Sequence, residues 1–88
     1  MKIKDGFVLE EVGGSYLAVA VGDRTNSFTG LVRLNSTGAY LWNILAENDV
    51  TREALVDKML SDYEVEREVV ERDVDAFCNK LIDNGIIE

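Results

Sequence analysis

The spacing of the hydrophobic residues changes once along the chain, near residue 35, and this change limits the folds open to it. Before that point, apolar-rich segments of strand length cover residues 7–12, 16–21 and 28–35. After it, hydrophobic residues recur at intervals of three and four, the spacing of a helix that buries one face. Because the strands precede the helices and do not alternate with them, the pattern predicts an α+β domain, with helices over one face of a small antiparallel sheet.

The first two strands are predicted to form a hairpin. Gly13 and Gly14 separate them, and a Gly-Gly pair tolerates the positive φ angles that a tight turn requires. Both faces of the second strand are apolar, so we expect helices or a partner to cover one of them. A polar loop over residues 22–27 precedes the third strand. In that strand, one face holds Phe28, Gly30, Val32 and Leu34, and the other holds Thr29, Leu31, Arg33 and Asn35.

Three helices are predicted after the strands. Residues 35–37 offer capping oxygens before the first, over residues 39–45; Thr51 can cap the second; and the third covers about residues 66–84, with Gly85 suited to end it. The stripes expected to face the core are Leu41, Ile44 and Leu45, then Leu55, Met59 and Tyr63, then Val70, Val74, Phe77 and Leu81. Trp42, Cys78, Ile86 and Ile87 are expected to pack with them.

The chain has 88 residues, enough for one small domain over residues 1–88 and too few for two cores. It contains no histidine and one cysteine, so it lacks the usual general base, the Cys-His nucleophile pair and the Cys/His zinc cluster. Glu71 and Asp75 lie one helical turn apart, but no imidazole or thiolate joins them, and we interpret them as surface charges. These features predict that the chain is not an enzyme.

Seventeen acidic residues against nine basic ones give a net charge of -8, which disfavours binding to nucleic acids and to anionic membranes. Residues 1–45 hold four cations and four anions, whereas residues 46–88 hold five cations and 13 anions. Three strands with three helices also describe a winged helix-turn-helix, whose recognition helix enters the major groove of DNA. Because the third helix begins Glu66-Arg67-Glu68, a winged-helix regulator of transcription is the weaker alternative.

The sequence also bears on the compartment. No apolar run approaches the roughly 18 residues of a membrane-spanning helix, and residues 1–5 lack the apolar stretch of a signal peptide. The lone Cys78 cannot form an internal disulfide. We therefore expect a cytoplasmic protein in which Cys78 is a small buried residue.

The third strand is the binding feature that physical reasoning suggests. A three-stranded sheet has edges, and an exposed edge offers unpaired N–H and C=O groups to an extended peptide. Residues 30–35 contain no proline and one charge, so little guards them against such pairing. A Val32→Pro change is expected to block it. The alternative, in which a helix or loop covers this edge, stays open on the sequence alone.

Four motifs follow one another along the chain. They are Leu34-Asn35-x-Thr37-Gly38-x-x-x-Trp42, Thr51-x-x-x-Leu55-Val56, Tyr63-x-Val65, and Asp73-Val74-x-x-Phe77-x-x-x-Leu81-x-x-x-Gly85-Ile86-Ile87. Each motif is common by itself, but their order and spacing together are specific. Over residues 7–87 the chain resembles the PqqD-like family, the peptide-recognition elements in the biosynthesis of ribosomally made, post-translationally modified peptides.

The resemblance implies a winged-helix-like fold that is not an enzyme and binds no cofactor. It also implies that the leader of a precursor peptide adds as a strand beside the third strand, in a groove against the third helix. A modifying enzyme, often a radical S-adenosylmethionine enzyme, would receive the leader, and any iron–sulfur cluster would belong to that partner. The residues implied are Leu31, Val32, Arg33 and Leu34 on the strand and Val69, Asp73, Val74, Phe77 and Lys80 on the helix, with Arg67 if the opposite flank faces the groove.

Two features qualify what the resemblance implies. The family often has a glycine after the first helix, where this chain has residues 46–49, Ala-Glu-Asn-Asp; Asn48 can still adopt the left-handed conformation there, so the expected fold is unchanged. The acidic third helix suggests a leader that carries Lys or Arg. A further class of function, an assembly adaptor with no peptide specificity, stays open on the sequence alone.

Overall fold

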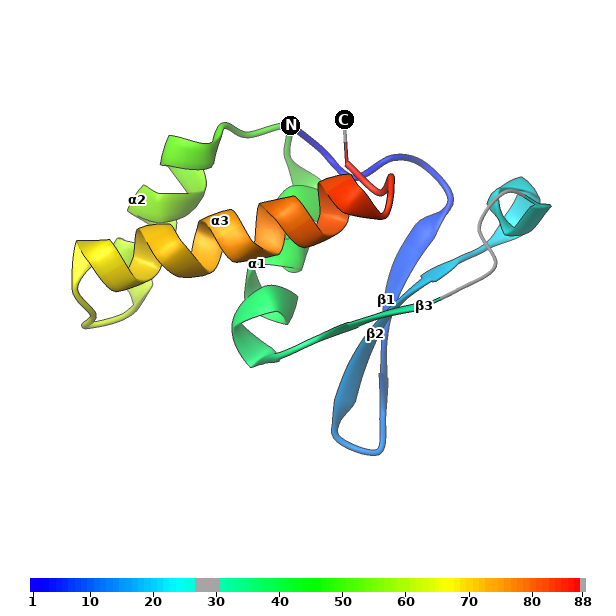
Figure 1. The fold of residues 1–88 in the computed structure, drawn as a ribbon, viewed down its shortest axis with the longest axis horizontal. Helices are drawn as coiled ribbons and strands as arrows, with labels where there is room; N and C mark the ends of the chain where they lie inside the picture. The colour runs from blue at the N-terminus through cyan, green and yellow to red at the C-terminus, as the bar shows by residue number, and fades with distance from the viewer. Residues whose placement is uncertain (27–30, 88) are drawn as a thin grey trace.

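The computed structural model describes residues 1–26 and 31–87, which form a small sheet followed by helices (Figure 1). The elements are β1 (Phe7–Val12), β2 (Ser15–Ala20), a 3-10 helix η1 (Gly22–Asn26), β3 (Leu31–Leu34), α1 (Ser36–Glu47), α2 (Arg52–Asp62) and α3 (Arg67–Asp83). The predicted α+β architecture of a three-stranded antiparallel sheet followed by three helices is confirmed. Residues 28–30, the predicted start of the third strand, lie outside the described residues.

The sheet has the strand order β1-β2-β3, which places β3 at an edge. Gly13 and Gly14 form the predicted turn between β1 and β2, with φ angles of 57° and 82° that L side chains rarely adopt. The helices cover one face of the sheet (Figure 1). Two rows of neighbours cross the three strands, Leu9-Ala18-Val32 on the face toward the helices and Val8-Val19-Leu31 on the open face.

Local signals place the helix ends close to the expected positions. Thr51 accepts a hydrogen bond from the Ala54 N–H at 3.1 Å and caps α2. Gly85, just after α3, has a φ of 70°, as predicted. Asn48 does not use the left-handed conformation open to it, because it is extended, with a φ of -144°. Its side-chain amide donates to the Ile44 carbonyl at 3.1 Å, which satisfies an end carbonyl of α1 without a left-handed residue.

The core lies where the three helices meet the covered face of the sheet. Trp42 and Cys78 are buried in it, as predicted. The Lys4 N–H donates to the Ile86 carbonyl at 2.8 Å, which ties the end of the chain to its start. Within residues 1–26 and 31–87, no helix combines the length and apolar composition needed to cross a membrane. The largest fully buried side chains are Leu41, Leu45, Leu55, Val56, Val70, Val74, Leu81 and Ile86.

Tyr63 was predicted to face the core but is 47% exposed. The reason is that α2 ends at Asp62, so Tyr63 no longer follows the helical period. Its ring instead packs edge-on against Tyr40 of α1, with ring centroids 5.1 Å apart. The Tyr40 hydroxyl donates to the Asp62 carboxylate, and burial together with this bond raises the pKa of Tyr40 above its usual value. The tyrosine pair therefore joins α1 to the end of α2.

Candidate functional site

Within the described sheet, β3 pairs with β2 on one side and leaves the other side of its backbone open. The N–H and C=O groups of successive residues in a strand point to opposite sides. The Arg33 carbonyl points to the outer side, where it accepts a hydrogen bond from Lys80 Nζ at 2.9 Å. By alternation, the groups of Leu31 also point outward, whereas those of Val32 and Leu34 point toward β2. Two residues of β3 can thus pair with an added chain.

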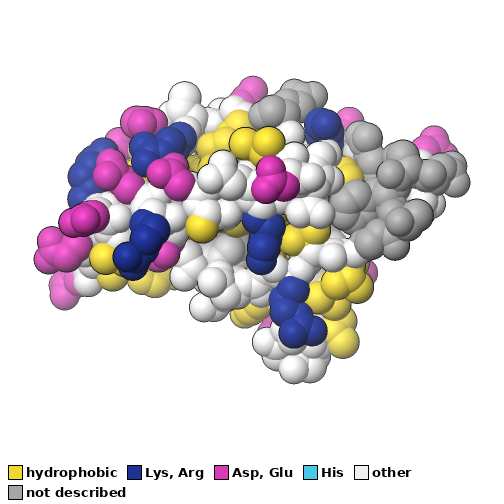
Figure 2. Space-filling view, in the orientation of Figure 1, with side chains coloured by type: hydrophobic (Ala, Val, Ile, Leu, Met, Phe, Trp, Pro, Cys, Tyr) yellow, Lys and Arg dark blue, Asp and Glu magenta, His cyan; other side chains and the backbone are white. Residues whose placement is uncertain are grey.

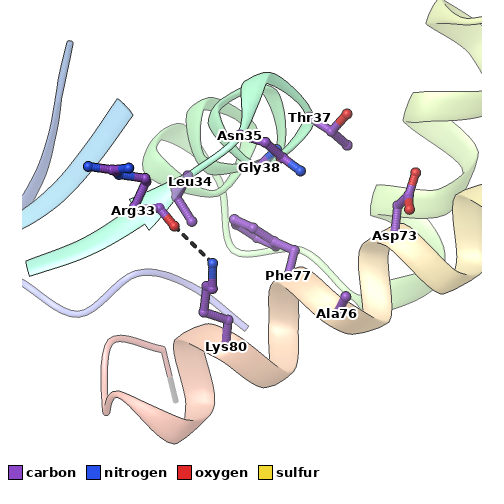
Figure 3. Close-up of a pocket in the computed structure, with 9 residues that line it drawn as sticks. All are labelled: Arg33, Leu34, Asn35, Thr37, Gly38, Asp73, Ala76, Phe77 and Lys80. Carbon is purple, nitrogen blue, oxygen red and sulfur yellow. Dashed lines mark hydrogen bonds between the residues drawn. The ribbon is translucent and has the colours of Figure 1, made fainter. Parts of the chain in front are cut away.

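A hollow of about 420 Å³ lies beside this edge, between the end of β3, the start of α1 and the middle of α3 (Figure 3). Phe77 points from α3 toward Leu34 and provides apolar surface, and Lys80 reaches across to the backbone of Arg33. Asp73 lies one turn before Phe77 in α3, on the side of the hollow near the start of α1. An extended chain that paired with β3 could place alternate side chains in this hollow. The lining residues are Arg33, Leu34, Asn35, Thr37, Gly38, Asp73, Ala76, Phe77 and Lys80.

Five of the sequence-predicted site residues line the hollow: Arg33, Leu34, Asp73, Phe77 and Lys80. The hydrogen bond between Lys80 and Arg33 joins positions 47 residues apart in the sequence. The flank of α3 that faces β3 is therefore the one that carries Asp73 and Lys80.

The other predicted site residues lie outside the hollow. Val32 is 6% exposed and Val74 is 0% exposed, so both side chains belong to the core. Leu31 is 58% exposed on the open face of the sheet, and its backbone faces the outer edge. Val69 is half-buried and lies one helical turn before Asp73, on the same side of α3. Of these four residues, Leu31 and Val69 are the two that an added strand could contact.

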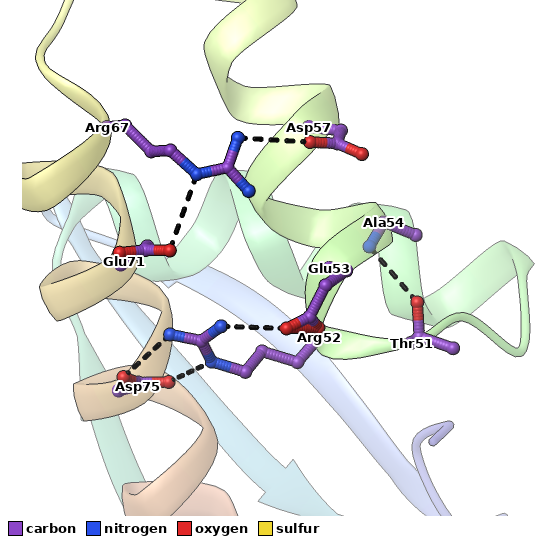
Figure 4. A network of polar contacts seen from close by, with 8 residues as sticks. All are labelled: Thr51, Arg52, Glu53, Ala54, Asp57, Arg67, Glu71 and Asp75. Carbon is purple, nitrogen blue, oxygen red and sulfur yellow. Dashed lines mark hydrogen bonds and ion pairs between the residues drawn. The ribbon is translucent and has the colours of Figure 1, made fainter.

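The opposite flank of α3 is joined to α2 by ion pairs (Figure 4). Arg67 places Nε 3.4 Å from Oε1 of Glu71 and Nη1 3.7 Å from Oδ1 of Asp57. Arg52 donates from Nη2 to Oδ2 of Asp75 at 3.0 Å and from Nε to the other carboxylate oxygen. These bonds lower the pKa of Asp75. Arg67 therefore faces α2, away from the hollow, and the two carboxylates on this flank each pair with an arginine.

Acidic side chains gather at the end of the molecule formed by α2 and the start of α3 (Figure 2). The charges at the hollow are more evenly balanced. Lys80 and Asp73 line it, and the Arg33 guanidinium points away from α3 (Figure 3). Glu71 and Asp75 face α2 and do not contribute to it. The expectation of a basic leader relied on the charge of the whole helix, whereas the residues of α3 that line the hollow include one acidic and one basic side chain, Asp73 and Lys80.

The described residues contain no group of three Asp, Glu or Cys side chains that could hold a metal ion. Cys78 is buried, and burial raises the pKa of its thiol, with a further contribution from the charge of Asp75. A raised pKa keeps the thiol protonated and unreactive. Cys78 therefore acts as a packing residue.

The amino-acid sequence of this chain matches a known protein family. Residues 18–87 match the model of the family described as coenzyme PQQ synthesis protein D (PqqD). The chain belongs to the PqqD family. The match includes β3 and all three α-helices, and thus every residue that lines the hollow. The resemblance inferred from the four motifs is confirmed.

A solved structure supports the same assignment. The PqqD-family chain is similar to the protein in the structure of TbiB1 in complex with the TbiA(beta) leader peptide, with a TM-score of 0.74 and 26% sequence identity. The similarity covers 100% of this chain and 95% of the other. A search of curated proteins gives no match.

Four lining residues of this PqqD-family chain were not among the predicted site residues: Asn35, Thr37, Gly38 and Ala76. The sequence held a signal for three of them, because Asn35, Thr37 and Gly38 belong to the first motif, which supports both a helix cap and the family resemblance. Asn35 Oδ1 accepts a hydrogen bond from the Gly38 N–H at 2.7 Å. A Cβ on Gly38 would lie 3.2 Å from the Cβ of Leu34. Glycine at this position therefore lets α1 begin directly against the end of β3.

Replacing the cap residue Asn35 by alanine is expected to destabilise the domain by about 1 kcal/mol, because the Gly38 N–H loses its acceptor. Chemical denaturation followed by circular dichroism measures this loss. The matched control is Asn43→Ala, at an exposed position inside α1, where alanine favours the helix. Equal stability of the two variants would show that the cap contributes nothing.

Proposed function

We propose that this PqqD-family chain binds the leader segment of a ribosomally made precursor peptide as an extra strand on the outer edge of β3. The observation that carries the proposal is the open edge, where the outward groups of Leu31 and Arg33 lie beside the hollow. Backbone hydrogen bonds to this edge supply affinity, and the hollow selects side chains. The leader peptide bound in the structure of the related TbiB1 supports this proposal.

Under this proposal, some of the predicted site residues contact the leader and the others do not. Leu34 and Phe77 belong to the core and also border the hollow with apolar atoms, and Asp73 and Lys80 supply its charges. Val69 extends the contact surface by one turn of α3. Val32 and Val74 act indirectly, since their burial holds β3 and α3 in place. Arg67 does not contact the leader, because it pairs with Asp57 and Glu71.

We propose that residues 1–88 work as one binding domain with no catalysis of its own. The domain presents the leader to a modifying enzyme, of the radical S-adenosylmethionine class, and that partner holds the iron–sulfur cluster. The single Cys78 agrees with the reducing cytoplasm as the working compartment. A role as a DNA-binding regulator has less support, because Glu66 and Glu68 flank the first residue of α3, at an end of the molecule where acidic side chains gather (Figure 2).

The test is fluorescence anisotropy with synthetic peptides that copy the N-terminal segments of small precursor peptides encoded beside the gene for this chain. At least one peptide is expected to bind in the micromolar range or more tightly, whereas a scrambled peptide of the same composition does not. A mobility-shift assay with DNA fragments from the same region is expected to show no complex. Binding to DNA, together with no binding to any of these peptides, would contradict the proposal.

A further inference from the structure

Lys80 occupies a position that an added strand needs. Its ammonium Nζ donates to the outward carbonyl of Arg33 at 2.9 Å (Figure 3). A strand that pairs with β3 places its backbone about 4.8 Å from β3 and donates an N–H to this same carbonyl. The ammonium and the backbone of the added strand cannot both fill this space. A leader that docks on β3 must therefore displace Lys80.

The displaced ammonium has no strong acceptor ready on its own helix. Asp73 lies seven residues earlier in α3, about 10.5 Å away along the helix axis, and Figure 3 shows its carboxylate on the side of Thr37, apart from Lys80. Asp83 lies one turn later, but Lys80 forms no ion pair with it and extends instead across the hollow to the Arg33 carbonyl. Glu71 and Asp75, on the far flank, already pair with arginines.

We infer that Lys80 makes the site selective for a leader with an Asp or Glu side chain facing it, and that its ammonium moves from the Arg33 carbonyl to that carboxylate when the strand docks. This inference rests on the proposed strand addition. A charge-assisted bond to the leader replaces the bond lost at Arg33, whereas a leader with a neutral residue at that position leaves the ammonium unpaired beside Phe77. The preferred charge in the leader is thus opposite to the one expected from the net charge of -8.

The test begins with selection from a display library of random 15-residue peptides against three forms of the protein. These are the wild type, Lys80→Met, and Lys58→Met, which removes a lysine of α2 that is paired with Asp62 at 3.6 Å, outside the hollow. Methionine keeps most of the aliphatic chain and removes the charge. Peptides enriched on the wild type and on Lys58→Met are expected to share an acidic residue at one fixed position. The preference for an acidic residue is expected to be absent from peptides enriched on Lys80→Met.

The second measurement uses two synthetic peptides from this selection that differ only as Glu or Gln at the acidic position. Wild-type protein is expected to bind the Glu peptide roughly threefold to tenfold more tightly, a range that allows for the solvent exposure of Lys80. The Lys80→Met variant is expected to bind both peptides equally. It is also expected to bind the Gln peptide about twofold more tightly than the wild type does, because no ammonium has to be displaced.

The outcomes separate this inference from the proposed function. Enriched peptides with no acidic preference, or a preference that persists in Lys80→Met, would overturn the inference and leave strand addition standing. Failure of the wild type to enrich any peptide would overturn the proposed function, and the inference with it.

Discussion

Replacing Arg33 by proline is expected to weaken peptide binding by at least about tenfold while the domain stays folded. The Arg33 N–H points away from β2, so its removal takes a donor from the outer edge and leaves the β2–β3 ladder intact. The pyrrolidine ring also fills the space in which an added strand would lie. A loss of this size corresponds to at least 1.4 kcal/mol of binding free energy. Fluorescence anisotropy with a peptide that binds the wild type measures it.

Two further variants make this result specific to the backbone. Arg33→Ala removes the same exposed side chain but keeps the N–H, and it is expected to bind the peptide within about threefold of the wild type. Val32→Pro, which the sequence alone suggested as the strand-breaking change, is expected to unfold the protein. The Val32 N–H faces β2 and its side chain is 6% exposed, so proline there breaks the ladder and the core together. Unweakened binding by a folded Arg33→Pro variant would exclude strand addition at this edge.

Replacing Phe77 by alanine is expected to lower the free energy of unfolding by about 3–5 kcal/mol. Phe77 is 5% exposed and belongs to the core, although it also lines the hollow (Figure 3). The loss combines the transfer free energy of the ring with the cavity that it leaves. It is a large share of the 5–15 kcal/mol typical of a whole domain. Urea denaturation followed by far-ultraviolet circular dichroism measures the change.

The matched control on the same helix is Ile82→Ala. Ile82 is 54% exposed, so its truncation is expected to cost less than about 1 kcal/mol. A further variant, Phe77→Leu, keeps an apolar side chain and is expected to retain most of the stability while it changes the shape of the hollow. A loss at Phe77 no larger than that at Ile82 would show that Phe77 does not support the core.

Most of the fold could be predicted because its determinants are local. The turn at Gly13 and Gly14, the cap at Thr51 and the end of α3 at Gly85 depend on φ angles and hydrogen bonds within a few residues. The buried stripe of α3 followed from helical spacing. Tyr63 shows the limit of that reasoning, since it continues the spacing of α2 but lies after its last residue, Asp62, where a different contact places it.

The candidate site could be predicted only in part. Spacing identified α3 and β3 as its two sides, and Arg33, Leu34, Asp73, Phe77 and Lys80 do line one hollow. The spacing of hydrophobic residues in the sequence could not show which residues of β3 and α3 line the hollow and which lie only in the core. The structure places Val32 and Val74 in the core and adds the cap motif at the start of α1 to the lining.

The sequence by itself determined the order of strands and helices, their ends and most of the core, because periodicity and capping act over a few residues. The tertiary structure alone decided which flank of α3 faces β3. That choice depends on how the helix packs: Arg52 and Arg67 bind one flank to α2, which leaves Asp73 and Lys80 toward the strand. It also brought Lys80 to the Arg33 carbonyl, a contact across 47 positions that no local pattern encodes.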